Sequence, residues 1–130
     1  MKTTQNLITL RQKYYWEGRN LQEQGQLLEA IEAFKIYASY LPEEDQHIPQ
    51  QWISELYDHV GENEQALIHL EAFARGCSPP RAAEVYKAIG EKYLSIHSVE
   101  KAISSFEKAI ENNPNIGVKK KLEELKSRPR

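Results

Sequence analysis

The sequence has little of what marks an exported or membrane-embedded protein. Cys77 is the only cysteine among 130 residues, so the chain cannot form an internal disulfide or a cysteine-rich metal site. The segment 1–16 contains no apolar run of signal-peptide length, and no stretch approaches the roughly 20 apolar residues of a membrane span. We therefore expect a soluble, cytoplasmic protein that does not enter a membrane.

A dominant charge is also missing. The 17 basic and 19 acidic residues give a formal net charge of −2, which does not indicate a nucleic-acid partner. A basic surplus lies only in the tail, where Lys119–Lys121 and Lys126 outnumber Glu123 and Glu124. The simplest interpretation of this tail is the solvated face of a last helix, and a nucleic-acid or membrane contact is the less favoured alternative.

Sequence motifs of enzyme chemistry are absent as well. There is no glycine-rich phosphate loop, no paired-histidine zinc motif and no nucleophile elbow. The four histidines lack metal-ligand spacing. Glu55 and Asp58 share one side of a helix, but without a pocket such a pair is most simply a solvated face. The sequence therefore predicts no enzyme, no catalytic residue, no metal site and no cofactor.

What the sequence does contain is a pair of amphipathic helical patterns over residues 86–114. Apolar or small side chains recur at i, i+3, i+4 and i+7 from Tyr86 to Tyr93, and the same spacing continues through 99–110. Pro114 ends the second pattern, because its ring and missing N–H prevent a helix from running on. The segment predicts a helical hairpin whose apolar face needs neighbours to cover it.

This pattern returns at intervals of 36 residues. Ala102 of the second helix is preceded at that spacing by Ala66 and Ala30, each within a similar apolar stripe. Pro42 stands where Pro114 stands in the last copy, and in the middle copy the prolines come one residue late. A fixed period of this length is typical of a repeat protein.

Glycines mark two further positions of the repeat. Gly18 and Gly90 lie at equivalent places in the first helices, where a small residue allows two helices to approach closely. Gly25 and Gly61 occupy the turn between the helices, and glycine tolerates the positive φ that such a turn often needs. His97 takes this place in the last copy, so that turn either differs or holds a strained residue.

The pattern Tyr86-x2-Ile89-Gly90-x2-Tyr93, followed by Ala102-x3-Phe106 and Pro114, resembles the tetratricopeptide repeat. The resemblance implies an all-α, right-handed α-solenoid of helical hairpins, with about seven helices in a single domain over residues 1–130. The expected elements are repeats at 11–44, 47–80 (degenerate) and 83–116, an extension of the first helix back to about residue 3, and a capping helix at 117–127. The two residues beyond the usual 34 are assigned to the linkers 43–46 and 79–82.

The capping helix is also supported by its own pattern. Val118, Leu122 and Leu125 recur at helical spacing beneath a face rich in lysine and glutamate. A terminal helix that is apolar inside and polar outside is what closes a repeat array.

In proteins that this chain resembles, the first helices of the repeats line a concave groove that binds a peptide or protein. Carried onto this sequence, the groove residues are Tyr15, Trp16, Arg19 and Glu23, then Gln51, Trp52, Glu55 and His59, then Lys87 and Glu91. Trp16 and Trp52 are 36 residues apart and take the same repeat position. Tryptophan is frequent at binding hot spots, but it also seals packing, and both interpretations stay open.

The expected groove is more acidic than basic, which favours an apolar segment with basic flanks as the partner. It argues against the type of groove that clamps a C-terminal carboxylate, because that type needs several cationic residues and only Arg19 matches. The resemblance thus implies a protein-binding adaptor. Two alternatives are a small chaperone that shields a secretion or assembly substrate, and a module for homo-oligomerisation.

Overall fold

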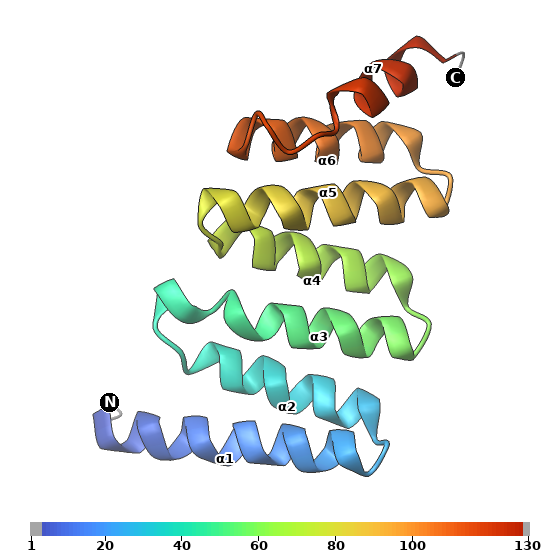
Figure 1. Ribbon diagram of the computed structural model, residues 1–130. Helices are drawn as coiled ribbons and strands as arrows, with labels where there is room; N and C mark the ends of the chain where they lie inside the picture. Colours follow the sequence, from blue (N-terminus) through green and yellow to red (C-terminus); the bar gives the residue numbers. More distant parts are fainter. Residues whose placement is uncertain (1–3, 129–130) are drawn as a thin grey trace. The chain divides into compact units, whose positions relative to one another are not determined.

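A computed structural model describes residues 4–128, which form seven α-helices and one short 3-10 helix (Figure 1). No residue in this range belongs to a β-strand, so the all-α class is confirmed. By its internal contacts the chain divides into two compact units, of which the first ends at Gly76 and the second begins at Cys77. The single-domain organisation and the solenoid stay predictions.

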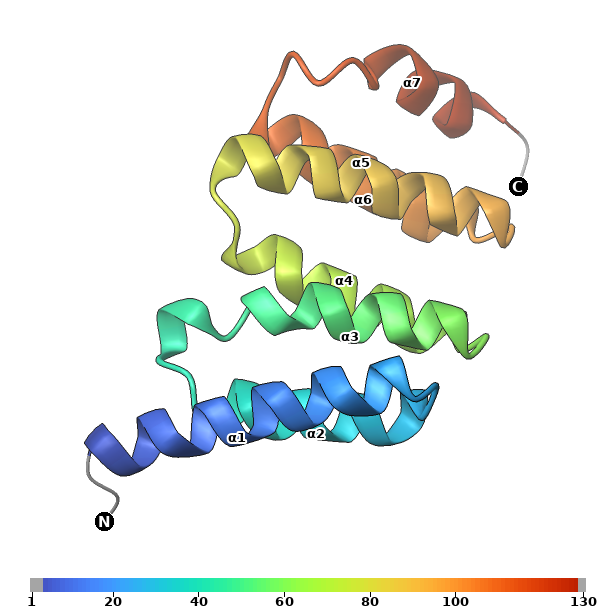
Figure 2. The ribbon, with the colours of Figure 1, turned by 60° about the horizontal axis from the view of Figure 1, so that its bottom comes forward.

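The first unit contains two helical hairpins. Its elements are α1 (Thr4–Glu23), α2 (Leu27–Ser39), the 3-10 helix η1 (Glu43–Asp45), α3 (Ile48–His59) and α4 (Asn63–Gly76). Successive α-helices pack against one another in alternating directions (Figures 1 and 2). Residues of α2 and α3 form one buried apolar cluster of the unit, which consists of Ala30, Ile31, Phe34, Ile53 and Leu56. Ala66, Leu67 and Ala74 of α4 are buried as well.

The second unit contains the third hairpin and the last helix. Its elements are α5 (Pro79–Ser95), α6 (Val99–Asn112) and α7 (Lys119–Ser127), and α7 packs on α6. Val118, Leu122 and Leu125 are buried, whereas Lys119–Lys121 are exposed. The apolar inner face and polar outer face that the sequence predicts for this helix are confirmed.

The first helix extends backwards as expected. It includes Thr4, the first residue that the structure describes, and the predicted start near residue 3 lies just outside that range. The stops at Pro42 and Pro114 are also confirmed, because α2 ends at Ser39 and α6 ends at Asn112.

The prediction that residues 79–82 form a linker is wrong. Pro79 and Pro80 are the first two residues of α5, which therefore begins four residues before the expected repeat boundary at 83. Proline is favoured in the first turn of a helix, because its missing N–H has no partner there and its fixed φ is already helical. The other expected linker contains η1.

The turns between the helices of the three hairpins have the same backbone hydrogen bonds. At the first turn the N–H of Gly25 bonds to the Gln22 carbonyl and that of Gln26 to the Leu21 carbonyl. This is the Schellman pattern, and it recurs at Gly61 and at His97. The φ values are +78° at Gly25, +84° at Gly61 and +63° at His97. His97 thus adopts the left-handed conformation that the turn requires, although it is not a glycine.

In the first hairpin, and again in the third, a close glycine–phenylalanine contact joins the two helices of that hairpin. A Cβ placed on Gly18 would lie 2.6 Å from the Phe34 ring, and one on Gly90 would lie 2.6 Å from the Phe106 ring. Both rings are almost fully buried. The prediction that these glycines permit close helix approach is confirmed, since a larger residue would push the ring away.

Within residues 4–128, no helix has both the length and the apolar character that crossing a membrane would need.

Candidate functional site

An aromatic cluster lies between α1, α2 and α3 and includes two of the predicted groove residues, Tyr15 and Trp52. The cluster consists of Tyr15, Phe34, Tyr37 and Trp52, with ring centroids of contacting pairs 5.5–5.9 Å apart. Phe34 belongs to the core, and Tyr15 and Trp52 are partly buried against it. The cluster therefore fixes the floor of a surface formed mainly by α1 and α3.

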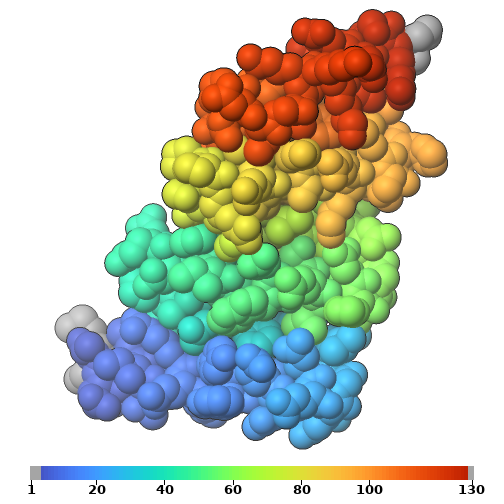
Figure 3. Space-filling view, viewed as in Figure 1, coloured from blue at the N-terminus to red at the C-terminus, as the bar shows by residue number. Residues whose placement is uncertain are grey.

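A cavity of about 240 Å³ opens above this cluster. Its lining residues are Tyr15, Arg19, Gln22, Phe34, Trp52 and Glu55. The space-filling view shows α1 and α3 side by side on the visible face of this unit (Figure 3). Four of the predicted groove residues are thus brought together: Tyr15, Arg19, Trp52 and Glu55.

Arg19 lines the cavity and is held by Tyr15. Its guanidinium donates a hydrogen bond of 3.1 Å to the Tyr15 hydroxyl and lies 5.9 Å from the centre of the same ring. Glu55 is exposed on α3 and lines the same cavity. A cation and an anion therefore stand at the rim of an aromatic hollow, a combination that suits a ligand carrying both apolar and polar groups.

Trp16 lies beside the cavity rather than in its wall. Its ring meets Tyr15 edge to face with centroids 5.2 Å apart, yet 61% of the residue is exposed. Trp52, at the equivalent repeat position, is packed against the core. The two tryptophans therefore differ: Trp52 is tied into packing, whereas Trp16 presents a large apolar surface to solvent.

The remaining predicted groove residues are not part of the cavity. Glu23 and His59 are exposed at the ends of α1 and α3, and Gln51 is partly buried next to Trp52. Lys87 and Glu91 lie one turn apart on α5, in the second unit. Their place in a common groove stays a prediction.

Sequence reasoning missed Phe34 and Tyr37 as parts of the site. Both lie on α2, a second helix of a hairpin, whereas the resemblance directed attention to first helices only. Burial raises the pKa of the Tyr37 hydroxyl above its usual value, helped by the nearby Tyr15. Their spacing of three residues on the apolar face of α2 was the available signal, because such a pair projects toward the neighbouring helices.

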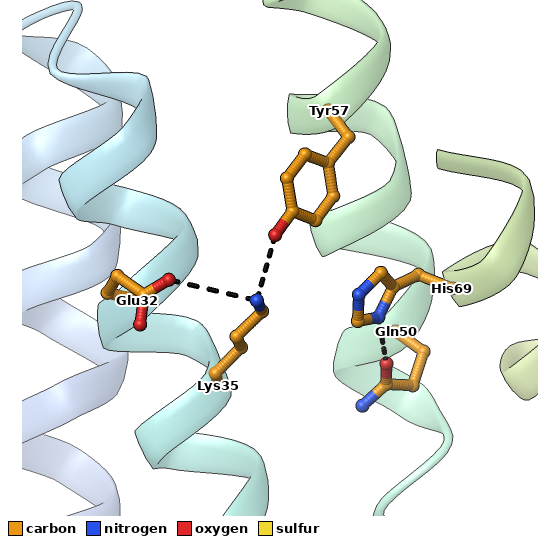
Figure 4. Close-up of polar contacts among 5 residues, drawn as sticks. All are labelled: Glu32, Lys35, Gln50, Tyr57 and His69. Atoms are coloured by element: carbon orange, nitrogen blue, oxygen red, sulfur yellow. Dashed lines mark hydrogen bonds and ion pairs between the residues drawn. The ribbon is translucent and has the colours of Figure 1, made fainter. Parts of the chain in front are cut away.

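A polar network connects α2, α3 and α4 on another part of the first unit (Figure 4). Lys35 donates a hydrogen bond of 2.8 Å to the Tyr57 hydroxyl and lies 3.7 Å from a Glu32 carboxylate oxygen. The bond to Tyr57 raises the pKa of Lys35, although burial opposes the shift. Figure 4 shows the ammonium group between its two partners, so the network links α2 to α3.

His69 extends this network to α4. Its ring stacks on Tyr57 with centroids 5.3 Å apart, and Nδ1 lies 2.6 Å from the amide oxygen of Gln50. Burial lowers the pKa of His69, and the charge of Lys35 lowers it further. The imidazole is therefore neutral at neutral pH and donates its Nδ1–H to Gln50.

Metal-ligating clusters and the single cysteine were the remaining candidates for chemistry in the described part of the chain. Residues 4–128 contain no cluster of three or more histidine, cysteine or carboxylate side chains that would hold a metal ion. Burial raises the pKa of the Cys77 thiol, although Arg81 opposes the shift, so the reactive thiolate is disfavoured.

Comparison with known proteins adds no assignment. The sequence matches no protein-family model, and no curated protein is significantly similar to it. The function must therefore be argued from the chain's own residues.

Proposed function

We propose that this protein is a tetratricopeptide-type adaptor, a right-handed α-solenoid that binds a peptide or protein segment on the face formed by α1 and α3. Three hairpins with the same turn support the repeat architecture. The two glycine–phenylalanine contacts, 72 residues apart in sequence, support it further. The proposal involves no catalytic residue and no cofactor, and the single cysteine suits a cytoplasmic location.

The observation that carries the proposal is the exposure of Trp16 beside the cavity. An exposed indole presents a large apolar area to water, which does not stabilise the isolated chain. Burying that area against a partner would be favourable. Tryptophan is also enriched among the few residues that dominate binding energy. Trp16 therefore serves as the anchor, and the cavity behind Tyr15 receives a side chain of the partner.

The partner is an apolar segment with basic flanks. The first unit carries twelve acidic and six basic residues, so its field attracts cations. Glu55 at the cavity rim provides a local counter-charge, and Arg19 gives a second polar contact to the peptide backbone.

The test is a selection of peptides on the wild-type protein from a displayed random library, followed by affinity measurements on variants. Trp16→Ala should weaken binding of the selected peptides about tenfold or more, since it removes a hot spot. Trp52→Ala should weaken binding and also lower stability, because Trp52 packs on the core. The far-ultraviolet circular dichroism of Trp16→Ala should equal that of the wild type.

Leu28→Ala is the matched control. Leu28 is 60% exposed, close to the value for Trp16, but it lies on α2 and does not line the cavity. The affinity of the Leu28→Ala variant for the selected peptides should equal that of the wild type. Equal binding by wild type and Trp16→Ala would contradict the proposal, and so would an equal loss in Leu28→Ala.

Self-association is the second candidate function. The second unit carries eleven basic and seven acidic residues, so its net charge is opposite to that of the first unit. Opposite charges on two units favour contact between the first unit of one chain and the second unit of another. Light scattering on the same samples distinguishes self-association from peptide binding. A mass above that of the monomer, which decreases when salt is added, would favour self-association.

A further inference from the structure

A second and larger cavity lies in the first unit, between the segment that contains η1 and one side of α4. It has a volume of about 590 Å³ and does not include any residue of the candidate groove. Cavities of roughly 300–1,000 Å³ are of the size that accommodates small ligands or whole side chains with their flanking backbone.

The lining charges of this cavity are divided between its two sides. Glu43 and Glu44 belong to η1 and are exposed, whereas Arg75 lies in the last turn of α4. No ion pair joins Arg75 to either glutamate within the described residues. A cationic group therefore finds its favourable position at the η1 side, away from Arg75.

Aromatic and apolar surfaces complete the cavity. The His47 ring stacks on Phe73 at 5.9 Å between centroids, and it lies so close to Gly76 that a Cβ there would overlap it. On α4, Ile68 is 53% exposed and lines the cavity next to Ala72. The cavity thus combines a fixed ring, an aliphatic wall and two carboxylates.

His69 also lines the cavity and adds no repulsion for a cation. Its imidazole is neutral because burial and Lys35 disfavour the protonated form. Its Nδ1–H is already used by Gln50. The charge that acts on His69 is that of Lys35 on α2, and the neutral ring of Tyr57 on α3 stacks on the imidazole. Neither residue lines the cavity.

We propose that this cavity binds an arginine side chain of a partner polypeptide, with the guanidinium at Glu43 and Glu44 and the aliphatic stem against Ile68. Arginine fits better than lysine for two reasons. Its planar group stacks on rings such as that of His47, and its fork of N–H donors matches carboxylates. The acidic balance of the first unit supplies the complementary field.

The test is a titration of the isotope-labelled protein with N-acetyl-arginine amide, followed by two-dimensional NMR of the backbone amides. The matched probe is N-acetyl-citrulline amide, which has nearly the same shape but no charge. At a pH of about 7.5, where an ordinary histidine is neutral, the arginine probe should cause saturable shifts within 43–50 and 68–76. The citrulline probe should cause none.

Two double variants and one single variant decide the outcome. Glu43→Gln with Glu44→Gln should weaken arginine binding about fivefold, as expected for the loss of two exposed charge pairs. Glu62→Gln with Glu64→Gln removes the same charge from exposed residues of the first unit that do not line the cavity, and should have no effect. Arg75→Gln should tighten binding, because it removes the repelling cation.

The proposal would be overturned by equal binding of the citrulline probe, by an equal loss in the Glu62/Glu64 variant, or by the absence of a saturable shift. Shifts confined to α1 and to Trp52 would place the probe in the groove instead, and would also count against the cavity. A failure here leaves the Trp16-dependent binding of peptides unaffected, so the two proposals are tested independently.

Discussion

The first and third hairpins differ from the middle hairpin in how their two helices are joined. In the outer hairpins a phenylalanine ring lies directly on a glycine, as Phe34 does on Gly18 and Phe106 on Gly90. In the middle hairpin Ser54 takes the glycine position and Leu70 the phenylalanine position. Ser54 is 2% exposed, and Leu70 is only partly buried.

A hydrogen bond replaces the ring contact in the middle hairpin. The Ser54 hydroxyl donates to the Ala66 carbonyl over 2.6 Å, which joins α3 to α4. The turn that follows α3 nevertheless has the same hydrogen bonds as the other two turns. The same hairpin turn therefore allows two kinds of joint between the paired helices, where a joint means the contact at the Gly18, Ser54 or Gly90 position. One kind depends on complementary volume and the other on a polar bond.

Removing the large side chain at each of these helix contacts should change the free energy of unfolding the most. Phe34→Ala or Phe106→Ala should lower the free energy of unfolding by about 3–5 kcal/mol, because each deletion leaves a cavity in the core. Leu70→Ala should cost only about 1–2 kcal/mol, because a partly buried leucine loses less apolar burial. Chemical denaturation followed by circular dichroism measures all three.

Equal losses in Leu70→Ala and Phe106→Ala would contradict the proposed difference between the joints. Leu28→Ala, at an exposed apolar position of α2, serves as the control and should change stability by less than about 0.5 kcal/mol.

Much of this architecture could be predicted from the sequence, because the period of small residues and stops is a local property. Gly18 and Gly90 leave room for a neighbouring ring because they lack a side chain, and Pro114 stops a helix because of its own ring. Both properties follow from residue type alone. The shared turn was also predictable where it contains glycine. At His97 the sequence left two possibilities, and the structure shows that this residue adopts a positive φ and keeps the turn hydrogen bonds of the other two hairpins.

The candidate site was predicted less completely, because it depends on neighbours far away in sequence. Trp16 and Trp52 occupy one repeat position, but only Trp52 has a preceding hairpin against which to pack, and it meets Phe34 and Tyr37 there. Repeat position alone therefore does not determine burial. Pro79 was misassigned because proline both ends and begins helices, and only the structure shows which applies.

Converting the glycine–phenylalanine joint of the third hairpin toward the serine–leucine type should have an intermediate effect on the free energy of unfolding. Gly90→Ser should lower the free energy of unfolding by about 1–3 kcal/mol, because the added atoms overlap the Phe106 ring. In the double variant Gly90→Ser with Phe106→Leu, the smaller side chain makes room for the serine. The combined loss should therefore be smaller than the sum of the two single losses by at least about 0.5 kcal/mol.

A double-mutant cycle on denaturation free energies measures this coupling. The pair Gly90→Ser with Leu125→Ala is the control. Leu125 belongs to α7, and the three atoms nearest to a Cβ at Gly90 all belong to Phe106. Additive losses in the first pair would show that the glycine and the ring do not act as one joint.

The smallest expected effect concerns the polar bond of the middle hairpin. Ser54→Ala removes the hydroxyl that bonds to Ala66 and should lower the free energy of unfolding by about 1 kcal/mol. Ser105→Ala is the matched control, because Ser105 is also buried but its hydroxyl bonds over 3.0 Å to Lys101 within its own helix. That change should be neutral or slightly stabilising, since alanine is the better helix former. If both variants lose the same free energy, the hydroxyl of Ser54 does not join α3 to α4, and packing alone would hold the middle hairpin together.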